Sequence, residues 1–271
     1  RISSSHLRCR HAAICMRESY TGAMTIIKPK HCSKPGRAHW MRPRSLTRDA
    51  AGQSLRQKVR CKYDERGKMK DIVLIDAGTG NLRSVQKALE SVGANVLRTE
   101  DVRKVLNAKN VVLPGVGAFG DFMDGMKAKG LDDAVKQVVS RGVPMLGICV
   151  GMQALFEIGE EMGEHEGLGL LKGTVVKFAD TLSVKIPHTG WNQVQVKKDA
   201  ALFDQIPDGA YVYFNHSYYC QAGDPSDVIA EVDYGIHYAC AVRRENVFGV
   251  QFHPEKSQAV GLRILKNFVE A

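Results

Sequence analysis

From residue 71 onward, short apolar runs alternate with segments that repeat apolar positions at helical spacing. Continuous apolar runs are typical of strands buried on both faces of a parallel sheet. The expected strands lie at 72–75, 94–98, 111–113 (closed by Pro114) and 143–148, and the expected helices at 81–91, 119–127 and 131–141. Alternating strands and helices of this kind predict an α/β fold: a doubly wound, largely parallel central sheet with helices on both faces.

The pattern changes after about Gly167, where short strand-like stretches are separated by turn-rich segments. These stretches lie at 174–178, 193–196, 211–214, 228–233, 238–242 and 247–252. Their spacing predicts an antiparallel or mixed second half that packs against the first. Ser257 is then expected to cap a closing helix that runs through Val269.

Residues 1–68 show neither the helical nor the strand-like spacing of apolar positions, and three prolines interrupt them. The chain carries a net charge of +9, and Lys and Arg far outnumber Asp and Glu in this segment, whereas acids slightly exceed bases in 69–271. We therefore expect a basic leader over 1–68 and one domain over 69–271. An organellar transit peptide, a disordered basic tail and translated sequence upstream of Met69 all fit the leader. Nucleic-acid binding is not indicated for the domain.

The cysteines and the hydropathy of the chain bear on its compartment. There is no Cys-x-x-Cys pair and no Cys/His spacing typical of zinc, so no metal is expected. Three cysteines in 69–271 fit free thiols in a reducing compartment. No apolar stretch approaches the roughly 20 residues of a membrane span. We expect a cytoplasmic protein without a membrane contact, with organellar targeting by the leader as the alternative.

The first candidate for chemistry is the stretch 144–153 (Pro-Met-Leu-Gly-Ile-Cys-Val-Gly-Met-Gln). A strand, a sharp turn and a helix would place Cys149 at the apex, in the layout of a nucleophile elbow. Gly147 and Gly151 would be needed because side chains that flank so tight a turn would collide. The N-terminus of the following helix would favour a thiolate. The alternative is an ordinary buried cysteine.

A second candidate lies near the C-terminus, in the stretch 248–255 (Phe-Gly-Val-Gln-Phe-His-Pro-Glu). In an extended chain, residues two apart point to the same side, so Glu255 can reach the ring of His253. A cysteine nucleophile needs a base, and that base needs a group that fixes its tautomer. The two motifs together predict a triad of Cys149, His253 and Glu255. An exposed turn is the alternative for the second motif alone.

The two motifs together resemble the class I, triad-type glutamine amidotransferases. Within that family, the stretch 76–84 (Asp-Ala-Gly-Thr-Gly-Asn-Leu-Arg-Ser) resembles one branch, the glutaminase subunits of imidazole glycerol phosphate synthases. The stretches 114–119, 190–192 (Gly-Trp-Asn) and 214–218 (Phe-Asn-His-Ser-Tyr) point the same way. The resemblance covers about 70–271 and leaves the leader outside it.

The resemblance implies hydrolysis of glutamine through a thioester on Cys149, with ammonia passed to a cyclase subunit in a heterodimer for histidine biosynthesis. It implies no cofactor. The residues that it marks are the oxyanion donors Val150, Gly115 and Val116, the glutamine contacts Gly117, Gln153, Glu161, His216, Ser217 and Tyr218, and the cyclase contacts Trp191 and Asn192. Core packing remains an alternative for His216 and Trp191, and an ordinary surface position for Glu161.

Other functions share some of these features. Another amidotransferase, such as the glutaminase of pyridoxal phosphate synthase, would share the triad but not the stretches 76–84 and 190–192. A cysteine hydrolase of the same fold acting on peptides or esters would not require Gln153. A non-enzymatic nucleic-acid binder would depend on the leader. A dinucleotide fingerprint at Gly78 and Gly80 lacks its third glycine, because Arg83 stands there.

Overall fold

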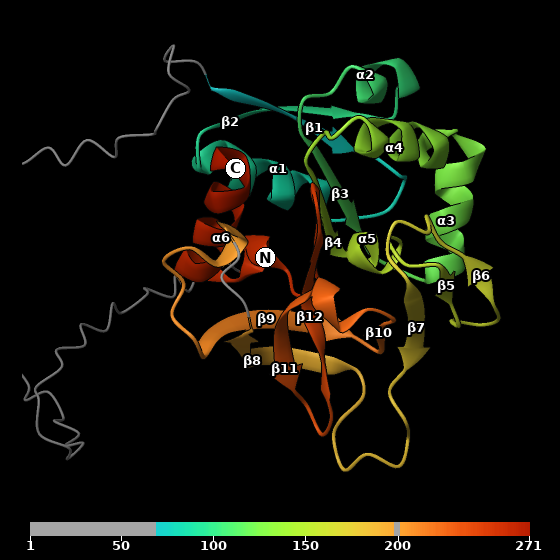
Figure 1. The fold of residues 1–271 in the computed structure, drawn as a ribbon, viewed down its shortest axis with the longest axis vertical. Coiled ribbons are helices and arrows are strands. Elements are labelled where there is room, and N and C mark those ends of the chain that lie inside the picture. Colours follow the sequence, from blue (N-terminus) through green and yellow to red (C-terminus); the bar gives the residue numbers. More distant parts are fainter. Residues whose placement is uncertain (1–68, 198–200) are drawn as a thin grey trace, which may run out of the picture. The chain divides into compact units, whose positions relative to one another are not determined.

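The computed structural model describes residues 69–197 and 201–271, so the leader predicted for 1–68 lies outside the described residues. In the first half, strands and helices follow each other as expected (Figure 1). They are β1 (Lys70–Ile75), α1 (Leu82–Ser91), β2 (Ala94–Thr99), α2 (Val102–Leu106), β3 (Val111–Gly115), α3 (Phe119–Ala128), α4 (Leu131–Ser140), β4 (Met145–Cys149) and α5 (Val150–Gln153).

The second half is mostly β-structure. Its strands are β5 (Ile158–Gly159), β6 (His165–Glu166), β7 (Gly173–Lys177), β8 (His188–Val196), β9 (Ala210–His216), β10 (Tyr218–Ala222), β11 (Val228–Asp233), β12 (His237–Arg244) and β13 (Val247–Val250). Three single 3₁₀ turns, η1 (Ala201–Phe203), η2 (Pro225–Asp227) and η3 (Pro254–Lys256), connect them, and helix α6 (Gln258–Glu270) follows.

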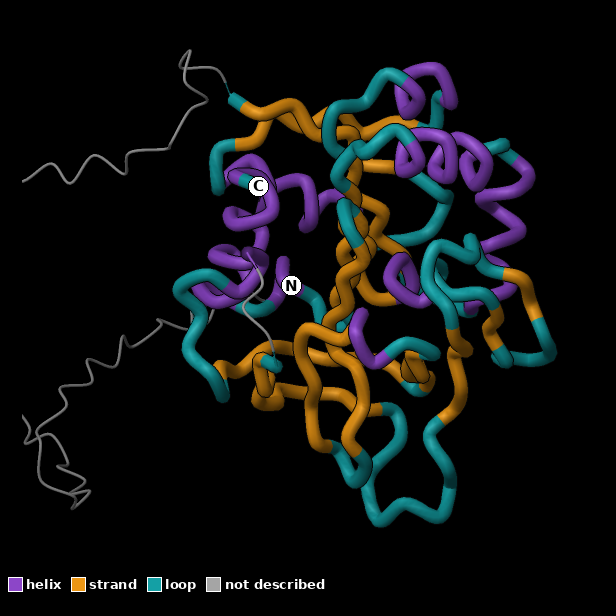
Figure 2. The backbone as a smooth tube through the Cα atoms, viewed as in Figure 1, coloured by secondary structure: helices purple, strands orange, loops and turns teal. Residues whose placement is uncertain are grey.

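The sheet is parallel in its first part. Its strands lie in the order β2-β1-β3-β4-β13, and all four of these pairings are parallel. Helices α1 and α6 lie on one side of these strands, and α3 and α4 lie on the other (Figures 1 and 2). The sequence prediction of a doubly wound sheet is therefore confirmed. Both faces are covered, which explains why β3 and β4 are buried along their whole length.

Beyond β13 the sheet continues as β12-β10-β7-β5-β6, and a branch runs through β11 to β8 and β9. Most of these pairings are antiparallel, as the change of pattern after Gly167 predicts. β13 is the last strand in the sequence, yet it lies between β4 and β12. This position joins the parallel and antiparallel parts into one sheet.

Several expected boundaries were wrong. β3 runs through Pro114 to Gly115, because β1 pairs only with Val111 and Val112 and the end of β3 has one neighbour, where a proline without an N–H is tolerated. β8 begins at His188, five residues before the expected stretch. The strand β10 and the five-residue helix α2 were not expected from the sequence, since each is short and α2 has one buried residue.

Ser257 does not cap the last helix with its side chain, contrary to expectation. Its hydroxyl instead donates to the carbonyl of His253 at 2.7 Å and accepts from the backbone N–H of Tyr213 at 3.0 Å. Two elements far apart in the sequence, β9 and the segment after β13, are thereby joined beside His253. Ser257 stabilises the position of the histidine rather than the helix.

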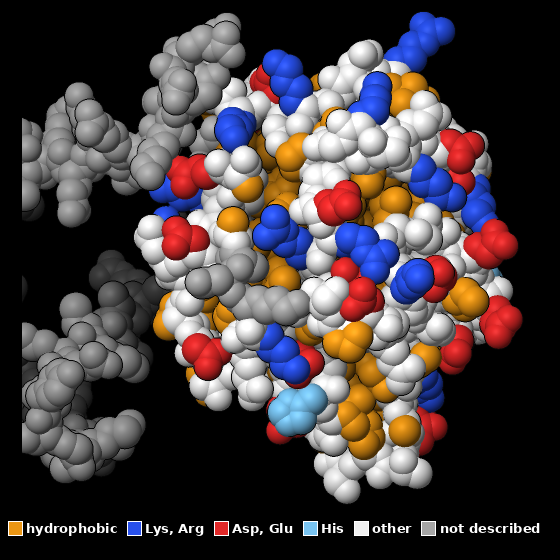
Figure 3. Space-filling model, viewed as in Figure 1, with side chains coloured by type: hydrophobic (Ala, Val, Ile, Leu, Met, Phe, Trp, Pro, Cys, Tyr) orange, Lys and Arg blue, Asp and Glu red, His pale blue; other side chains and the backbone are white. Residues whose placement is uncertain are grey.

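Charged side chains of both signs are mixed on the face shown in Figure 3, and neither sign forms a large separate area there. Within the residues that the structure describes, no helix is long and apolar enough to cross a membrane.

Candidate active site

The sharp turn predicted at Cys149 is present. Strand β4 ends at Cys149, whose backbone has φ of 55° and ψ of −113°, and helix α5 begins at the next residue. A positive φ is uncommon for a residue with a side chain and marks a strained turn. The turn requires both flanking glycines: an added Cβ would lie 2.5 Å from the Gly151 carbonyl oxygen at Gly147, and 1.8 Å from the Leu113 carbonyl oxygen at Gly151.

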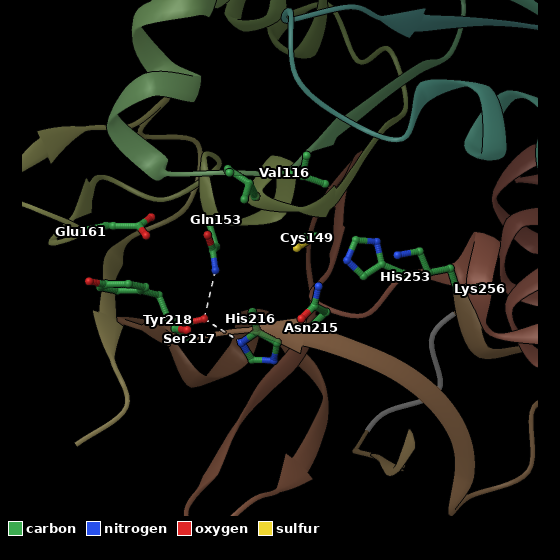
Figure 4. A pocket seen from close by; sticks show the side chains of 12 residues that line it. Val116, Cys149, Gln153, Glu161, Asn215, His216, Ser217, Tyr218, His253 and Lys256 are labelled. Carbon is green, nitrogen blue, oxygen red and sulfur yellow. Dashed lines mark hydrogen bonds between the residues drawn. The ribbon is translucent and has the colours of Figure 1, made fainter. Parts of the chain in front are cut away.

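Strand β13 brings His253 to this turn from more than a hundred residues away. β13 pairs in parallel with β4, with Val250 opposite Ile148, so the two carboxyl ends meet at the same edge. The backbone N–H of His253 donates to the carbonyl of Tyr213 at 2.9 Å. The His253 ring therefore faces the sulfur of Cys149, and Figure 4 shows the two side chains next to each other.

Glu255 holds the other side of the His253 ring. Its Oε1 lies 3.0 Å from Nδ1 of His253, and the two side chains are 1% and 5% exposed. A carboxylate at Nδ1 keeps a proton there and leaves Nε2 to act on the sulfur. The second oxygen, Oε2, is buried without a hydrogen-bond partner among the described residues, so the carboxylate has one strong interaction, with the histidine.

The electrostatics favour a charged histidine. Burial alone would lower the pKa of His253, but hydrogen bonds to Cys149 and Glu255 and the negative charge of both groups raise it from 6.5 to about 9. At neutral pH the ring is then an imidazolium between a sulfur and a carboxylate. An imidazolium in contact with a thiol stabilises the thiolate, which is the reactive form of cysteine.

This pKa predicts a pH dependence of stability. Because the folded protein binds the His253 proton more tightly than the unfolded chain, the stabilisation is complete below pH 6.5 and is lost as the pH rises toward 9. We expect the free energy of unfolding, measured with urea, to fall over this range in the wild type and to fall less in His253→Gln. Equal slopes for the two proteins would contradict the assignment.

A pocket of about 220 Å³ opens in front of Cys149 (Figure 4). It brings together most of the residues that the sequence marks for glutamine and its oxyanion. The lining residues are Val116, Gly117, Cys149, Val150, Gln153, Glu161, Asn215, His216, Ser217, Tyr218, His253 and Lys256. They come from β4, α5, β9, β10 and η3 and from the loops that follow β3, β5, β9 and β13. The pocket therefore lies where the parallel sheet meets the antiparallel part.

The fold and this pocket agree with a comparison against known families. The model of the class-I glutamine amidotransferases matches residues 73–271. The chain belongs to this family. The family resemblance seen in the sequence is thereby confirmed over almost all of the described residues.

Two curated relatives of this amidotransferase carry the printed name "Imidazole glycerol phosphate synthase subunit HisH". The relative from Salinibacter ruber is 50% identical over 200 residues, which are 72% of this chain and 92% of the relative. The relative from Aquifex aeolicus is 48% identical over 197 residues, or 72% and 94% of the two chains.

Solved structures show the same fold at low sequence identity. The structure of PurLQS from Thermotoga maritima has a TM-score of 0.59 at 19% identity, and covers 74% of this chain and 98% of that one. A structure titled as a glutamine amidotransferase has a TM-score of 0.58 at 21% identity, with coverages of 73% and 97%. At these identities, the likeness concerns the fold alone.

Two residues predicted for the active site of this amidotransferase lie just behind the pocket rather than in its lining. Glu255 contacts His253 from the far side. Gly115 ends β3, where an added Cβ would lie 2.6 Å from the ring of Phe122 and 2.9 Å from the backbone nitrogen of Gly151. Only glycine fits there, which keeps the start of the Gly115–Gly117 loop close to the turn at Cys149. Their roles as positioning group and oxyanion donor remain predictions.

Glu161 has a structural contact as well as a place in the pocket. Its Oε2 accepts from the backbone N–H of Phe119 at 2.7 Å, at the first turn of α3. A carboxylate at a helix N-terminus is stabilised by the free N–H groups and the helix dipole. The contact also ties the segment after Gly117 to the wall that carries Glu161. The role of Glu161 in binding glutamine stays a prediction.

Trp191 and Asn192 lie away from the pocket, on β8. Trp191 is 45% exposed and, with Tyr211 at 54%, borders a groove that also contains the first residues of α6. Asn192 is partly buried, and its amide donates to the carbonyl of Asp233 at 2.9 Å. The structure thus leaves Trp191 accessible to a partner, whereas Asn192 is tied to its own domain.

Sequence reasoning missed three residues at the site: Asn215, Lys256 and above all Gln251. Gln251 is fully buried, and its Nε2 lies 3.8 Å from the sulfur of Cys149, within reach of a weak hydrogen bond. A signal was present, because Gln251 is the one polar residue in an apolar run and stands two positions before His253, on the same side of the chain.

No group of three or more His, Cys, Asp or Glu side chains that could hold a metal ion occurs within 69–197 and 201–271. The three cysteines in these ranges are all free and buried.

Proposed function

We propose that this chain is the glutaminase subunit of an imidazole glycerol phosphate synthase and that it passes ammonia to a cyclase subunit. The relatives that bear this synthase's name are 46–50% identical and are covered over 92–99% of their own length. The observation that carries the catalytic part is the contact of His253 with both Cys149 and Glu255 beside a pocket.

In the proposed reaction, the thiolate of Cys149 attacks the side-chain amide carbon of glutamine. The C–N bond breaks when the imidazolium of His253 gives its proton to the leaving nitrogen, and ammonia departs. The neutral ring then takes a proton from water, which attacks the thioester and releases glutamate. Glu255 keeps the ring oriented through both steps.

The tetrahedral intermediate needs N–H donors for its oxygen. The N–H of Val150 is suitable because it opens α5 and has no acceptor within the helix. The peptide between Gly115 and Val116 is the second candidate. The adjacent Gly117 has φ of 94°, with nothing within 4 Å of the position that a Cβ would take, and a glycine there gives the backbone the freedom to reorient this peptide.

The same proposal assigns the substrate contacts. Gln153, Glu161 and the segment from His216 to Tyr218 surround the space in front of Cys149 (Figure 4). Glu161, a carboxylate with one oxygen already bound to Phe119, suits the ammonium group of glutamine. On the outer face, the exposed Trp191 suits a cyclase contact, because tryptophan is enriched where interfaces bind most strongly.

The test is co-purification with a candidate cyclase, followed by an assay of glutamate release with and without the cyclase's nucleotide substrate. The proposal requires a stable complex and glutamine-dependent synthesis of imidazole glycerol phosphate. Hydrolysis of glutamine with no binding to that cyclase would indicate another amidotransferase. Hydrolysis of peptides or esters instead would indicate a different cysteine hydrolase.

We also propose that residues 69–271 form the catalytic domain by themselves, since the family model begins at residue 73. Deletion of 1–68 is expected to leave kcat and KM for glutamine within about twofold of the full chain, measured in the complex. A large loss of activity would show that the leader takes part in the fold.

A further inference from the structure

The buried hydroxyl of Tyr238 lies between two histidines, outside the group of residues assigned above to catalysis. Its oxygen is 2.8 Å from Nδ1 of His188 and 3.0 Å from Nε2 of His216. His188 is held flat between the rings of Phe214 and Tyr234, with centroids at 4.6 and 3.7 Å. The three polar side chains thus have fixed orientations in the core beneath the pocket.

The neighbours of this group determine where each proton lies. The amide of Asn192 must present its NH₂ to His188, because its oxygen accepts from the N–H of Gln193 and its nitrogen donates to the carbonyl of Asp233. Nε2 of His188, 3.4 Å from that NH₂, is therefore an acceptor without a proton. The proton of His188 is on Nδ1, and it is donated to Tyr238.

The same reasoning applies to His216 from the other side. Its Nδ1 lies 2.8 Å from the backbone carbonyl of Tyr218, which can only accept, so Nδ1 carries the proton. Nε2 is then bare and accepts the hydroxyl proton of Tyr238. Both histidines are neutral in this arrangement, which agrees with burial: it lowers the pKa of His188 to about 4 and that of His216 to about 3.

The hydrogen bonds continue into the pocket. The carbonyl of Tyr218 also accepts from Nε2 of Gln153 at 3.0 Å, and that same nitrogen lies 3.2 Å from Oε1 of Gln251. Gln251 in turn faces the sulfur of Cys149. The Tyr218 carbonyl is therefore held by two donors, one of which depends on the proton of His216.

We propose that Tyr238 is a positioning residue for the glutamine pocket: by donating to Nε2 of His216, it holds the ring in the orientation in which the Nδ1 proton binds the Tyr218 carbonyl, and so supports the pocket wall from His216 to Tyr218. Without the hydroxyl, Nε2 of His216 has no hydrogen-bond partner, and the ring is held only through the bond from Nδ1 to the Tyr218 carbonyl. The wall then has one hydrogen bond fewer holding it in place. The kinetic consequence rests on the proposed glutaminase function, whereas the proton positions do not.

The direct measurement is ¹⁵N NMR of the ring nitrogens in the full chain labelled at histidine, since a protonated and a bare ring nitrogen differ strongly in chemical shift. We expect His188 and His216 both to be neutral with the proton on Nδ1, and Tyr238→Phe to shift the Nε2 resonance of His216, which loses its hydrogen bond, while the proton stays on Nδ1. Wild-type protein with the His216 proton on Nε2 would overturn the inference, even if the variant failed to fold.

The kinetic measurement uses the full chain in complex with the candidate cyclase. Tyr238→Phe is expected to raise KM for glutamine about fivefold, the effect of one lost hydrogen bond, with kcat changed less than twofold because Cys149 and His253 are untouched. Tyr219→Phe is the matched control: its hydroxyl accepts from Gln221, outside this group, and KM should stay at the wild-type value. An unchanged KM in Tyr238→Phe, or an equal rise in both variants, would also overturn the inference. If the wild-type complex hydrolyses no glutamine, the proposed function fails, and the NMR result still stands.

Discussion

Replacing Cys149 with alanine is expected to lower glutamine-dependent synthesis by about 10⁴-fold or more, because no other group can form the thioester. Synthesis from an added ammonium salt should remain within twofold of the wild type when the cyclase is present, since that route bypasses the pocket. The measurement is the rate of imidazole glycerol phosphate formation from each nitrogen source. Equal loss of both activities would count against a separate site for ammonia release.

Cys240→Ala is a suitable control for this variant. Cys240 is a fully buried thiol on β12 and is not among the residues that line the pocket. Its replacement removes a sulfur from the core and is expected to lower stability by about 1–2 kcal/mol while the glutamine-dependent rate stays close to the wild type. A loss as large as that of Cys149→Ala would point to general damage by thiol removal.

Replacing His253 with glutamine is expected to reduce the glutamine-dependent rate by about 10³-fold, the usual size of a lost general acid and base. The sulfur of Cys149 also loses its cationic partner, so alkylation by iodoacetamide at pH 7 should become slower in the variant. Ammonium-dependent synthesis should again be preserved. The comparison of glutamine-dependent with ammonium-dependent synthesis separates the chemistry of glutamine hydrolysis from the activity of the cyclase.

His237→Gln supplies the matched control, because His237 is 59% exposed on β12 and its nearest acidic group, on Asp233, is 3.9 Å away. Its replacement should change neither rate nor alkylation. A glutamine-dependent rate in His253→Gln within tenfold of the wild type would show that another group acts as the base.

Hydrophobic periodicity was enough to predict the strands β1 to β4 of the parallel part, but it placed β13 in the antiparallel or mixed half. Strands such as β4 are continuously apolar because helices cover both faces of the sheet. A continuous apolar run of this kind is easy to recognise in the sequence. For β8, which begins at His188, only the end at 193–196 was predicted. Its burial alternates irregularly, since one end packs in the core beside Phe214 and the middle exposes Trp191. A strand with such irregular burial shows no regular spacing of apolar residues in the sequence.

Only part of the candidate site could be predicted from the sequence, for a related reason. Gly147 and Gly151 mark the turn at Cys149 because the local backbone excludes every other residue, and that requirement is visible within five positions. The contacts of Gln251 and Tyr238 arise from pairing between strands that are distant in the sequence. Local patterns therefore indicated the position of the proposed nucleophile, but not which buried amide and hydroxyl groups surround it.

The place of β13 in the middle of the sheet has a consequence for biosynthesis of the protein. While the chain emerges from the ribosome, the turn at Cys149 is translated long before β13, and the gap between β4 and β12 cannot be filled until β13 arrives. The nascent polypeptide therefore carries the proposed nucleophile, Cys149, without the proposed base, His253, and is not expected to hydrolyse glutamine. Onset of activity should coincide with release of the finished C-terminal segment.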